Sequence, residues 1–306
     1  MIKKEIIDLV VSRTKVAQRD LIGRDILLHR LLIELSSNKY FFENYAFKGG
    51  TCLMKCYLNY YRFSEDLDFT YINQEEFEKK SGKQIRNIMS KKINLILKIL
   101  GGISAKIGFD FKTIKSNNRY VELGASNKQT TFKLWYIPEG SSDETFIKIQ
   151  INFLEKIEYS IVEKEADNVF FGKYKDFQSA FLLPEDSEWL LKIPRLRCYN
   201  IKEILIEKVR AILTRKGTKA RDYIDIYMIE KKEKLDVRNF KKQIIEKVRA
   251  VIKFEKYKTN LGKKQEASFT FNRVEERAIL LIPLPDDFDA FFNRFKIFLQ
   301  ELIKEI

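Results

Sequence analysis

The amino-acid sequence predicts an α+β fold, in which a mixed first part is followed by a basic helical region. Apolar and polar residues alternate, or aromatic and β-branched residues gather, in four segments between residues 107 and 153. After residue 200, apolar residues instead recur at helical spacing. The 306 residues, 45% of them hydrophobic, are enough for one large or two modest cores. We predict an α+β core over 1–190 and a helical region over 191–306.

In residues 2–61, the sequence predicts helices before and after one short strand. Apolar residues recur at helical spacing over 2–12 and 15–36. The segment 45–48 has the composition of a strand and ends at two glycines. Thr51 then suits the N-cap of a helix over 51–61.

The remaining elements follow from the same two periodicities. A strand over 66–72 and a helix over 75–100 are expected first. Four further strands are predicted over 107–114, 121–124, 130–137 and 146–153. The C-terminal helices are predicted over 201–216, 219–231, 236–256 and 287–306.

The positive charge of the chain is concentrated in one segment. The net charge is +14, and residues 191–265 alone hold 23 Lys and Arg against 9 Asp and Glu. Such a concentration favours a surface that meets nucleic acid. An anionic partner protein, a membrane surface and a merely solvated face are the alternatives. The Lys-rich stretch 231–265 lacks the apolar face of a membrane-surface helix, so we expect no membrane partner.

Composition excludes several kinds of chemistry. His29 is the single histidine, which excludes a His-based zinc site, and there is no Gly-x-Ser-x-Gly elbow of a serine hydrolase. No apolar run approaches the roughly 18 to 20 residues of a membrane span, and the N-terminus does not resemble a secretory signal. Cys52, Cys56 and Cys198 match no zinc spacing. We therefore expect a reduced, cytoplasmic protein.

A glycine pair at a strand-to-helix junction predicts a phosphate-binding turn. Gly49 and Gly50 let a ligand approach the backbone closely, and the N–H groups of a first helical turn favour a phosphate. The Thr51 hydroxyl can add one more hydrogen bond. The alternative is a plain helix-terminating glycine with no ligand.

Two aspartates follow this turn in the next predicted strand. Asp66 and Asp68 are two residues apart, so both side chains project from one face of the strand. Adjacent carboxylates repel each other unless a cation lies between them. Mg²⁺ prefers carboxylate oxygens together with substrate phosphates. The pair therefore predicts a metal-dependent site for phosphoryl transfer, the alternative being a solvated strand edge.

These motifs resemble those of a known family. KGGTCLMK at 48–55, followed by RFSEDLDF at 62–69, resembles the nucleotidyl transferase toxins of the AbiEii/AbiGii type. These toxins belong to the minimal-nucleotidyltransferase branch of the DNA polymerase β-like superfamily. KEILIEKVRAILTRKGTKARDYIDIYMI at 202–229 resembles the family's later helical motif. The resemblance covers residues 20–230 approximately.

The resemblance implies a fold and a set of site residues. A polymerase β-like core with a mixed sheet would hold a nucleoside triphosphate, and the helical region would complete the active-site cleft and bind the acceptor. The implied nucleotide-binding residues are Gly49, Gly50, Thr51, Ser64 and Lys208, the implied metal ligands are Asp66 and Asp68, and the implied catalytic residues are Asp66, Asp68, Lys208, Asp222 and Asp225. Within the basic segment we expect nucleic-acid contacts from Arg215, Lys216, Lys219 and Arg221.

The resemblance also implies an activity and partners. The chain would transfer an NMP from an NTP to a nucleic-acid acceptor, with tRNA favoured, using Mg²⁺ or Mn²⁺. It would be the toxin of a toxin–antitoxin (abortive infection) system with a separate antitoxin protein. The alternatives are NMP transfer to a protein hydroxyl, and an inactive nucleotidyltransferase fold that binds RNA or a partner.

One departure from the superfamily pattern favours the inactive alternative. Related enzymes often take a third carboxylate from a neighbouring strand, but the polar face of 146–153 carries Lys148, Gln150 and Asn152. The first acid beyond them is Glu155. Either Asp222 or Asp225 could supply the base instead, or the acceptor hydroxyl needs none. Asp225 could equally form a structural i,i+4 ion pair with Arg221.

Overall fold

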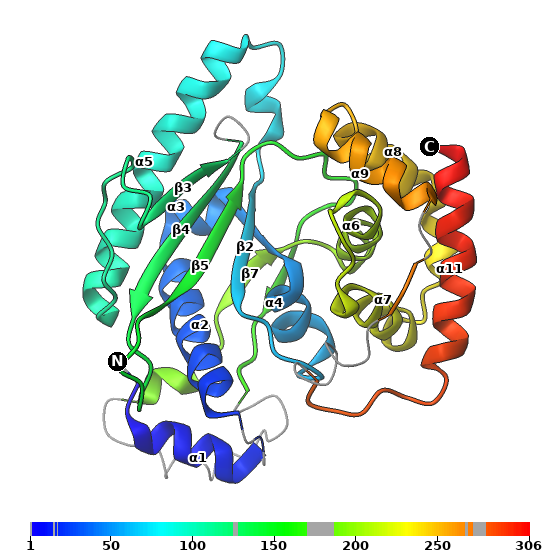
Figure 1. The fold of residues 1–306 in the computed structure, drawn as a ribbon. Coiled ribbons are helices and arrows are strands. Elements are labelled where there is room, and N and C mark those ends of the chain that lie inside the picture. The colour runs from blue at the N-terminus through cyan, green and yellow to red at the C-terminus, as the bar shows by residue number, and fades with distance from the viewer. Residues whose placement is uncertain are drawn as a thin grey trace. The chain divides into compact units, whose positions relative to one another are not determined.

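The computed structural model describes residues 2–14, 16, 18–124, 128–169, 187–266, 269–271 and 280–306 (Figure 1). The chain divides into two units. The first, which we call the sheet unit, consists of residues Met1–Glu155 and Ile161–Tyr199. The second, the helical unit, consists of Lys156–Ser160 and Asn200–Ile306.

A seven-stranded mixed sheet forms the centre of the sheet unit, with strand order β3-β4-β5-β2-β1-β7-β6 among the described residues. Its strands are β1 (Tyr45–Lys48), β2 (Asp66–Tyr71), β3 (Val121–Gly124), β4 (Gln129–Tyr136), β5 (Thr145–Asn152), β6 (Val162–Glu165) and β7 (Arg195–Cys198). The β2–β5 and β1–β7 pairs are parallel and the other neighbours are antiparallel. The predicted α+β fold with a mixed sheet is confirmed.

Helices of the sheet unit begin and end at recognisable sequence signals. They are α1 (Lys4–Thr14), α2 (Arg19–Ser37), α3 (Lys39–Asn44), α4 (Gly49–Leu53) and α5 (Gly82–Ile107), with a π-helical turn at Met54–Leu58 and 3-10 turns at Gln74–Phe77 and Glu188–Leu191. The long helix α5 starts with a capping box between Ser81 and Gln84 and ends at Gly108, whose φ is +95°. In Figure 1, α2 passes behind the sheet.

Alternation along β2 and β5 separates an apolar face of the sheet from a polar one. Leu67 and Phe69 of β2 are fully buried, as are the isoleucines of β5. Between them, Asp66, Asp68 and Gln150 are half-buried. Because side chains alternate along a strand, burying the apolar residues directs every polar one to the opposite face.

The helical unit is an all-helical bundle around α6. Its helices are α6 (Ile201–Thr214), α7 (Ala220–Glu233), α8 (Lys241–Val251), α9 (Glu255–Glu266) and α11 (Phe288–Glu305), with a 3-10 turn at Val237–Phe240. Helix α6 packs against α7, α8 and α9. In the part of the chain that the structure describes, no helix is both long and apolar enough to cross a membrane.

A buried ion-pair network joins α6 to α8. The Lys247 ammonium lies 2.6 Å from Glu203 and 2.5 Å from Glu207, and it donates to the Lys156 carbonyl at 2.8 Å. Glu203 also accepts the N–H of Tyr159 at 2.8 Å. Burial raises the pKa of Glu203 despite the attraction of Lys247. These contacts explain why the short segment 156–160 belongs to the helical unit.

The prediction of a strand over 107–114 is wrong. Helix α5 continues to Ile107, and Gly108 ends it in the left-handed conformation that favours glycine. Of the predicted strand, only Asp110 forms an isolated bridge, to Trp135. The alternating apolar residues Ile107 and Phe109 are buried, but they lie on either side of a helix end rather than in a strand.

Other elements differ from their predicted bounds. The helix expected over 51–61 starts at Gly49 and passes into the π-helical turn after Leu53. The helix expected over 236–256 breaks into a 3-10 turn, α8 and the start of α9. Strands β6 and β7 and helices α3 and α9 are not predicted by the sequence. Both strands have only four residues, and β6 is mostly charged, so neither shows a clear strand pattern.

His29 is a structural residue of the sheet unit. It is fully buried in α2, and its Nε2 lies 2.8 Å from the Lys192 carbonyl oxygen. Burial, aided by the nearby positive charge of Lys55, lowers the pKa of His29 to about 3. The folded chain therefore keeps this ring neutral throughout the physiological pH range.

Acidification should destabilise the sheet unit through His29. The unfolded chain protonates this residue near pH 6.5, whereas the folded chain does so only near pH 3. Between pH 6.5 and 5, the free energy of unfolding should therefore fall as the pH falls, by up to about 1.4 kcal/mol per pH unit. Urea denaturation at several pH values measures this slope. His29→Gln should flatten it, and equal slopes in the two chains would contradict the assignment.

Candidate active site

Gly49 lies where β1 meets α4, in a position that only glycine can occupy. Its φ is +77°, a conformation that side chains rarely adopt. A Cβ atom at this position would lie 2.4 Å from Oδ2 of Asp68. The register of β1 with β2 explains this proximity, because Lys48 pairs with Asp68. The glycine turn and the second aspartate are therefore in direct contact.

Three other residues of the predicted nucleotide-binding set, Gly50, Thr51 and Ser64, lie around the same turn, whereas Lys208 belongs to the helical unit. A Cβ atom on Gly50 would lie 2.7 Å from Nη2 of Arg62 and 3.0 Å from Oγ of Ser64. Thr51 Oγ1 lies 2.8 Å from Ser64 Oγ and also bonds the carbonyl oxygen of Asp66. The buried Thr51 hydroxyl thus ties the first turn of α4 to the segment before β2.

Asp66 and Asp68 share one face of β2, as predicted. In the parallel pairing with β5, they lie beside Lys148 and Gln150 respectively. The Lys148 ammonium is 3.5 Å from Asp66 Oδ2, and both side chains are about one third exposed, at 36% and 35%. Two accessible carboxylates on one face, next to a backbone turn without side chains, form a donor set of hard oxygens that fits Mg²⁺ or Mn²⁺.

Glu155 does not provide a third carboxylate for this pair. Its carboxylate forms an ion pair with Lys48, and it accepts hydrogen bonds from Thr70 at 2.9 Å and from Asn152 at 3.1 Å. The Tyr199 hydroxyl lies 3.3 Å from the same oxygen. Since Glu155 is engaged by these partners, its structural task is to hold Lys48 on the polar face of the sheet.

Sequence reasoning did not single out Lys48 or Arg62 as site residues. Lys48 is the first residue of the KGGT motif, and it lies directly opposite Asp68 in the pairing of β1 with β2. The register of these two strands would have identified it. Arg62 is 1% exposed, and its Nη1 donates to the Phe63 carbonyl at 2.7 Å. Its guanidinium packs against Gly50, so it supports the glycine turn from beneath.

The later motif forms a second charged cluster, in the helical unit. The Lys208 ammonium lies 2.9 Å from Asp222 and 2.6 Å from Asp225, and Arg215 lies 2.6 Å from Asp222. Burial would raise the pKa of Asp222, but Lys208 and Arg215 hold it below its ordinary value. A carboxylate held in this way is a weak base. Asp225 therefore forms an ion pair with Lys208, whereas the alternative weighed from the sequence was an ion pair between Asp225 and Arg221.

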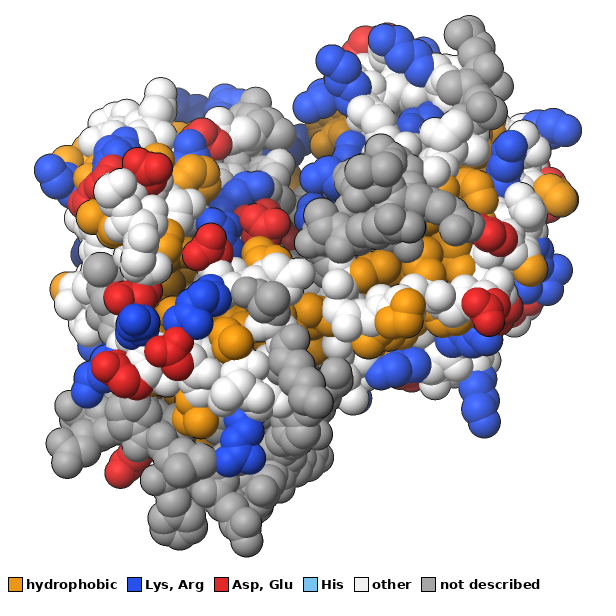
Figure 2. Space-filling model, turned by 60° about the horizontal axis from the view of Figure 1, so that its bottom comes forward, with side chains coloured by type: hydrophobic (Ala, Val, Ile, Leu, Met, Phe, Trp, Pro, Cys, Tyr) orange, Lys and Arg blue, Asp and Glu red, His pale blue; other side chains and the backbone are white. Residues whose placement is uncertain are grey.

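The predicted nucleic-acid contacts lie at and beside the loop between α6 and α7. Arg215, Lys216 and Lys219 are exposed there, and Arg221 is half-buried in the first turn of α7. Gly217, with φ of +122°, lies in the middle of this loop. On the face shown in Figure 2, blue Lys and Arg side chains outnumber red acidic ones over the helical part. The loop presents its cations to solvent.

Comparison with known proteins decides the family. A model of the nucleotidyl transferase AbiEii toxins of type IV toxin–antitoxin systems matches residues 30–303. The chain belongs to this family. The resemblance seen in the sequence motifs is confirmed, and the family implies an antitoxin partner. No curated protein matches the chain.

The solved structure of one nucleotidyltransferase toxin supports the same fold. The nucleotidyltransferase toxin MenT4 of Mycobacterium tuberculosis aligns with a TM-score of 0.56 at 17% sequence identity, over 98% of this chain and 90% of that one. JHP933 of Helicobacter pylori aligns with a TM-score of 0.43 at 16% identity, over 95% of each chain. The similarity to MenT4 shows that this AbiEii-family chain has the fold of a nucleotidyltransferase toxin.

Gly49→Ala should disrupt the site, and Gly140→Ala is its matched control. Both glycines have nearly the same φ, +77° and +78°, but a Cβ on Gly140 would meet nothing within 4 Å. Each variant should lose about 1–2 kcal/mol of stability from backbone strain. Gly49→Ala alone should also displace Asp68 and weaken Mn²⁺ binding, measured by calorimetry with and without NTP. Equal Mn²⁺ affinities in the two variants would show that Gly49 does not shape the site.

Proposed function

We propose that the chain is a Mg²⁺-dependent nucleotidyltransferase that transfers an NMP from an NTP to a nucleic-acid acceptor, with tRNA as the favoured acceptor, and acts as the toxin of its toxin–antitoxin pair. The observation that carries the proposal is the position of Asp66 and Asp68. Both carboxylates project from one face of β2, and Asp68 lies against the Gly49 turn. Metal ligands and a phosphate-binding backbone are thus adjacent.

In this reaction, an acceptor hydroxyl attacks the α-phosphorus of the NTP. A new phosphodiester bond forms, the bond to the β-phosphate oxygen breaks, and pyrophosphate leaves while the hydroxyl proton passes to a base or to water. A divalent ion held by Asp66 and Asp68 would neutralise charge on the phosphates. The backbone N–H groups at Gly49 and Gly50 would bind phosphate oxygens. The chain contributes positioning and charge complementarity, with no covalent intermediate.

We propose that Lys208 contacts a phosphate of the NTP. Asp222 and Asp225 would hold the Lys208 side chain in position for this contact. The support is that two buried carboxylates hold one lysine, at 2.9 and 2.6 Å. Because its paired state lowers the pKa of Asp222, this residue suits a positioning role better than the role of general base. The polar face of β5 carries Gln150 beside Asp68, so we expect the acceptor hydroxyl to react without a carboxylate base from that strand.

We assign acceptor binding to the helical part of the predicted region 191–306, which begins at Asn200, with Arg215, Lys216, Lys219 and Arg221 contacting phosphates. The support is the net charge of the segment 191–265 and the exposure of the loop cations. Binding through phosphate contacts releases counterions, so the acceptor affinity should fall steeply as salt rises. A flat salt response would count against this part of the proposal.

A labelling experiment tests the reaction. The chain is incubated with total tRNA, Mg²⁺ and each α-³²P-labelled NTP in turn, and the products are separated on a denaturing gel. We expect label on tRNA, which should disappear with the Asp66→Asn, Asp68→Asn double variant. The exposed Asp143→Asn is the matched control and should leave labelling unchanged.

The other outcomes of this experiment decide between the alternatives. Label on a protein band would move the acceptor to an amino-acid hydroxyl. No label on any molecule, together with no calorimetric signal for any NTP, would leave a nucleotidyltransferase fold that only binds RNA or a partner.

The role of Lys208 can be separated from its structural effect. Lys208→Met leaves two buried carboxylates without this cation and should destabilise the chain by about 3–5 kcal/mol. A triple variant, Lys208→Met, Asp222→Asn and Asp225→Asn, removes all three charges and should recover much of this loss. Transfer activity should be absent from both. Activity that returns with stability in the triple variant would show that Lys208 is only structural.

A further inference from the structure

The three cysteines, whose spacing along the chain matches no zinc motif, are brought together by the fold of the sheet unit. Cys52 and Cys56 are four residues apart, in α4 and in the π-helical turn that follows it. Cys198 ends β7, which pairs in parallel with β1 at Phe47. Because β1 leads directly into α4, this pairing brings Cys198 beside the other two. The three Sγ atoms all lie within 4.8 Å of one another.

The spacing of the sulfur atoms suits a shared ion. All three cysteines are free, and the Sγ atoms of Cys56 and Cys198 are 3.9 Å apart, far beyond disulfide length. Zinc binds thiolate sulfur at about 2.3 Å, which places two sulfurs of a tetrahedral site about 3.8 Å apart. The observed separation therefore matches two thiolates that share one metal ion.

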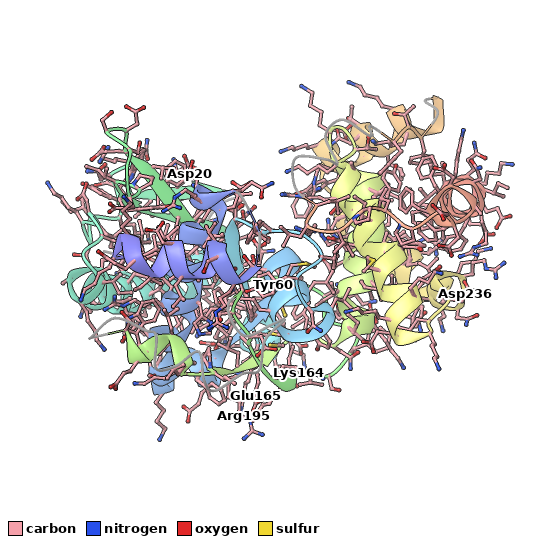
Figure 3. The ribbon with its side chains drawn as sticks, turned by 90° about the horizontal axis from the view of Figure 1, so that it is seen from below. Asp20, Tyr60, Lys164, Glu165, Arg195 and Asp236 are labelled. Carbon is pink, nitrogen blue, oxygen red and sulfur yellow. The ribbon has the colours of Figure 1, made fainter. Side chains whose placement is uncertain are left out.

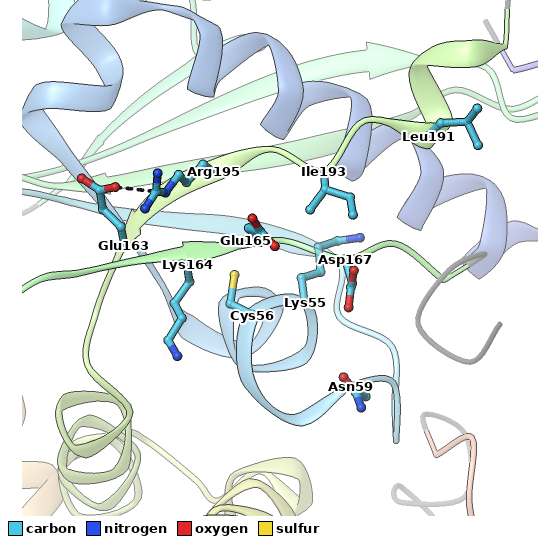
Figure 4. A pocket seen from close by; sticks show the side chains of 10 residues that line it. All are labelled: Lys55, Cys56, Asn59, Glu163, Lys164, Glu165, Asp167, Leu191, Ile193 and Arg195. Carbon is cyan, nitrogen blue, oxygen red and sulfur yellow. Dashed lines mark ion pairs between the residues drawn. The ribbon is translucent and has the colours of Figure 1, made fainter. Parts of the chain in front are cut away.

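The surroundings of the cluster provide access from one side. Cys52 and Cys198 are fully buried, whereas Cys56 is half-buried. Cys56 lines a cavity of about 620 Å³ together with Lys164, Glu165 and Asp167. Figure 4 shows the Cys56 sulfur pointing toward the part of the cavity beneath Glu165. The cavity gives an ion a route to the sulfurs.

The wall of the cavity carries both cations and carboxylates. Lys55, Lys164 and Arg195 line it as well, and in Figure 3 the last two lie close to Glu165 at the β6–β7 edge of the sheet unit. Of these cations, Lys55 is paired with Asp25 at 2.8 Å and Arg195 with Glu163 at 3.1 Å, so their charges are already balanced. Glu165 and Asp167 also line the cavity, and a water molecule in the cavity would complete the fourth position.

We propose that Cys52, Cys56 and Cys198 form a binding site for one Zn²⁺ ion, with the fourth position open to the cavity. Three soft sulfur donors select zinc over Mg²⁺, which the oxygen donors Asp66 and Asp68 suit better. The ion would cross-link the end of β7 to α4, the helix that begins with the glycine turn. Because the ion would bind the folded chain and not the unfolded one, it would stabilise the folded chain. This proposal does not depend on the transfer reaction.

Cobalt provides a direct probe, because Co²⁺ bound to thiolates absorbs strongly through sulfur-to-metal charge transfer. The reduced, full-length chain is freed of metal with a chelator and titrated with Co²⁺ and then with Zn²⁺. We expect the charge-transfer band to saturate at one Co²⁺ per chain, with the intensity of three thiolates, and to disappear when Zn²⁺ displaces Co²⁺. Since the chain has only three cysteines, every thiolate signal comes from this cluster.

Two variants control the titration. Cys56→Ser changes the half-buried member and should weaken Co²⁺ binding by more than the ~10-fold cost of losing an outer-shell partner. Glu163→Gln changes another residue of the cavity wall and should bind as the unaltered chain does. Zn²⁺ should raise the Tm of the unaltered chain and of Glu163→Gln, but not that of Cys56→Ser.

The proposal is overturned if the unaltered chain gives no sulfur-to-cobalt band. It is equally overturned if Cys56→Ser binds Co²⁺ as tightly as the unaltered chain. The first result needs no variant, so a folding defect in Cys56→Ser cannot conceal it, and circular dichroism of each variant checks that the second comparison is made between folded chains.

Discussion

The contact between Gly49 and the Asp68 carboxylate is the constraint on which the candidate active site depends. A methyl group at Gly49 would fall 2.4 Å from Asp68 Oδ2, so the backbone turn and the Asp68 carboxylate are too close for a side chain to lie between them. The register of β1 with β2 sets this distance, and the parallel pairing of β2 with β5 places Lys148 and Gln150 along the same face. Arg62 and Thr51 then hold the turn and the strand together from beneath.

Charge pairing determines which acidic residues stay available for chemistry. Glu155 is committed to Lys48, and Asp222 and Asp225 are committed to Lys208, so each of these carboxylates holds a lysine in place. Burying such pairs costs desolvation energy, and breaking one leaves an uncompensated buried charge. Asp66 differs, because it is about one third exposed and its ion-pair partner among the described residues, Lys148, is 3.5 Å away. The half-buried pair on β2 is therefore where we propose the divalent ion, whereas the buried pairs position cations.

Most regular elements could be predicted because their signals are local. The strands 121–124 and 45–48 are found at their predicted bounds, and the helices near 201–214 and 288–305 follow apolar periodicity closely. The prediction failed where a local pattern had two structural meanings. Alternation around Ile107 and Phe109 suggested a strand but belongs to a helix end at Gly108. The short strand β6 pairs with β7, and β7 pairs with β1. The local sequence of neither strand predicts this pairing.

The sequence by itself determined the fold class through local periodicity, and the family through motifs at 48–69 and 202–229. The glycine turn and the aspartate pair could be recognised together because they lie within about twenty residues joined by one helix. Only the tertiary structure decided what distant residues do together. Glu155 is 107 residues from the Lys48 that it holds, and Cys198 is 142 residues from the Cys56 that it meets. Spacing along the chain carries no information about such pairs, since strand order and register in the sheet bring them together.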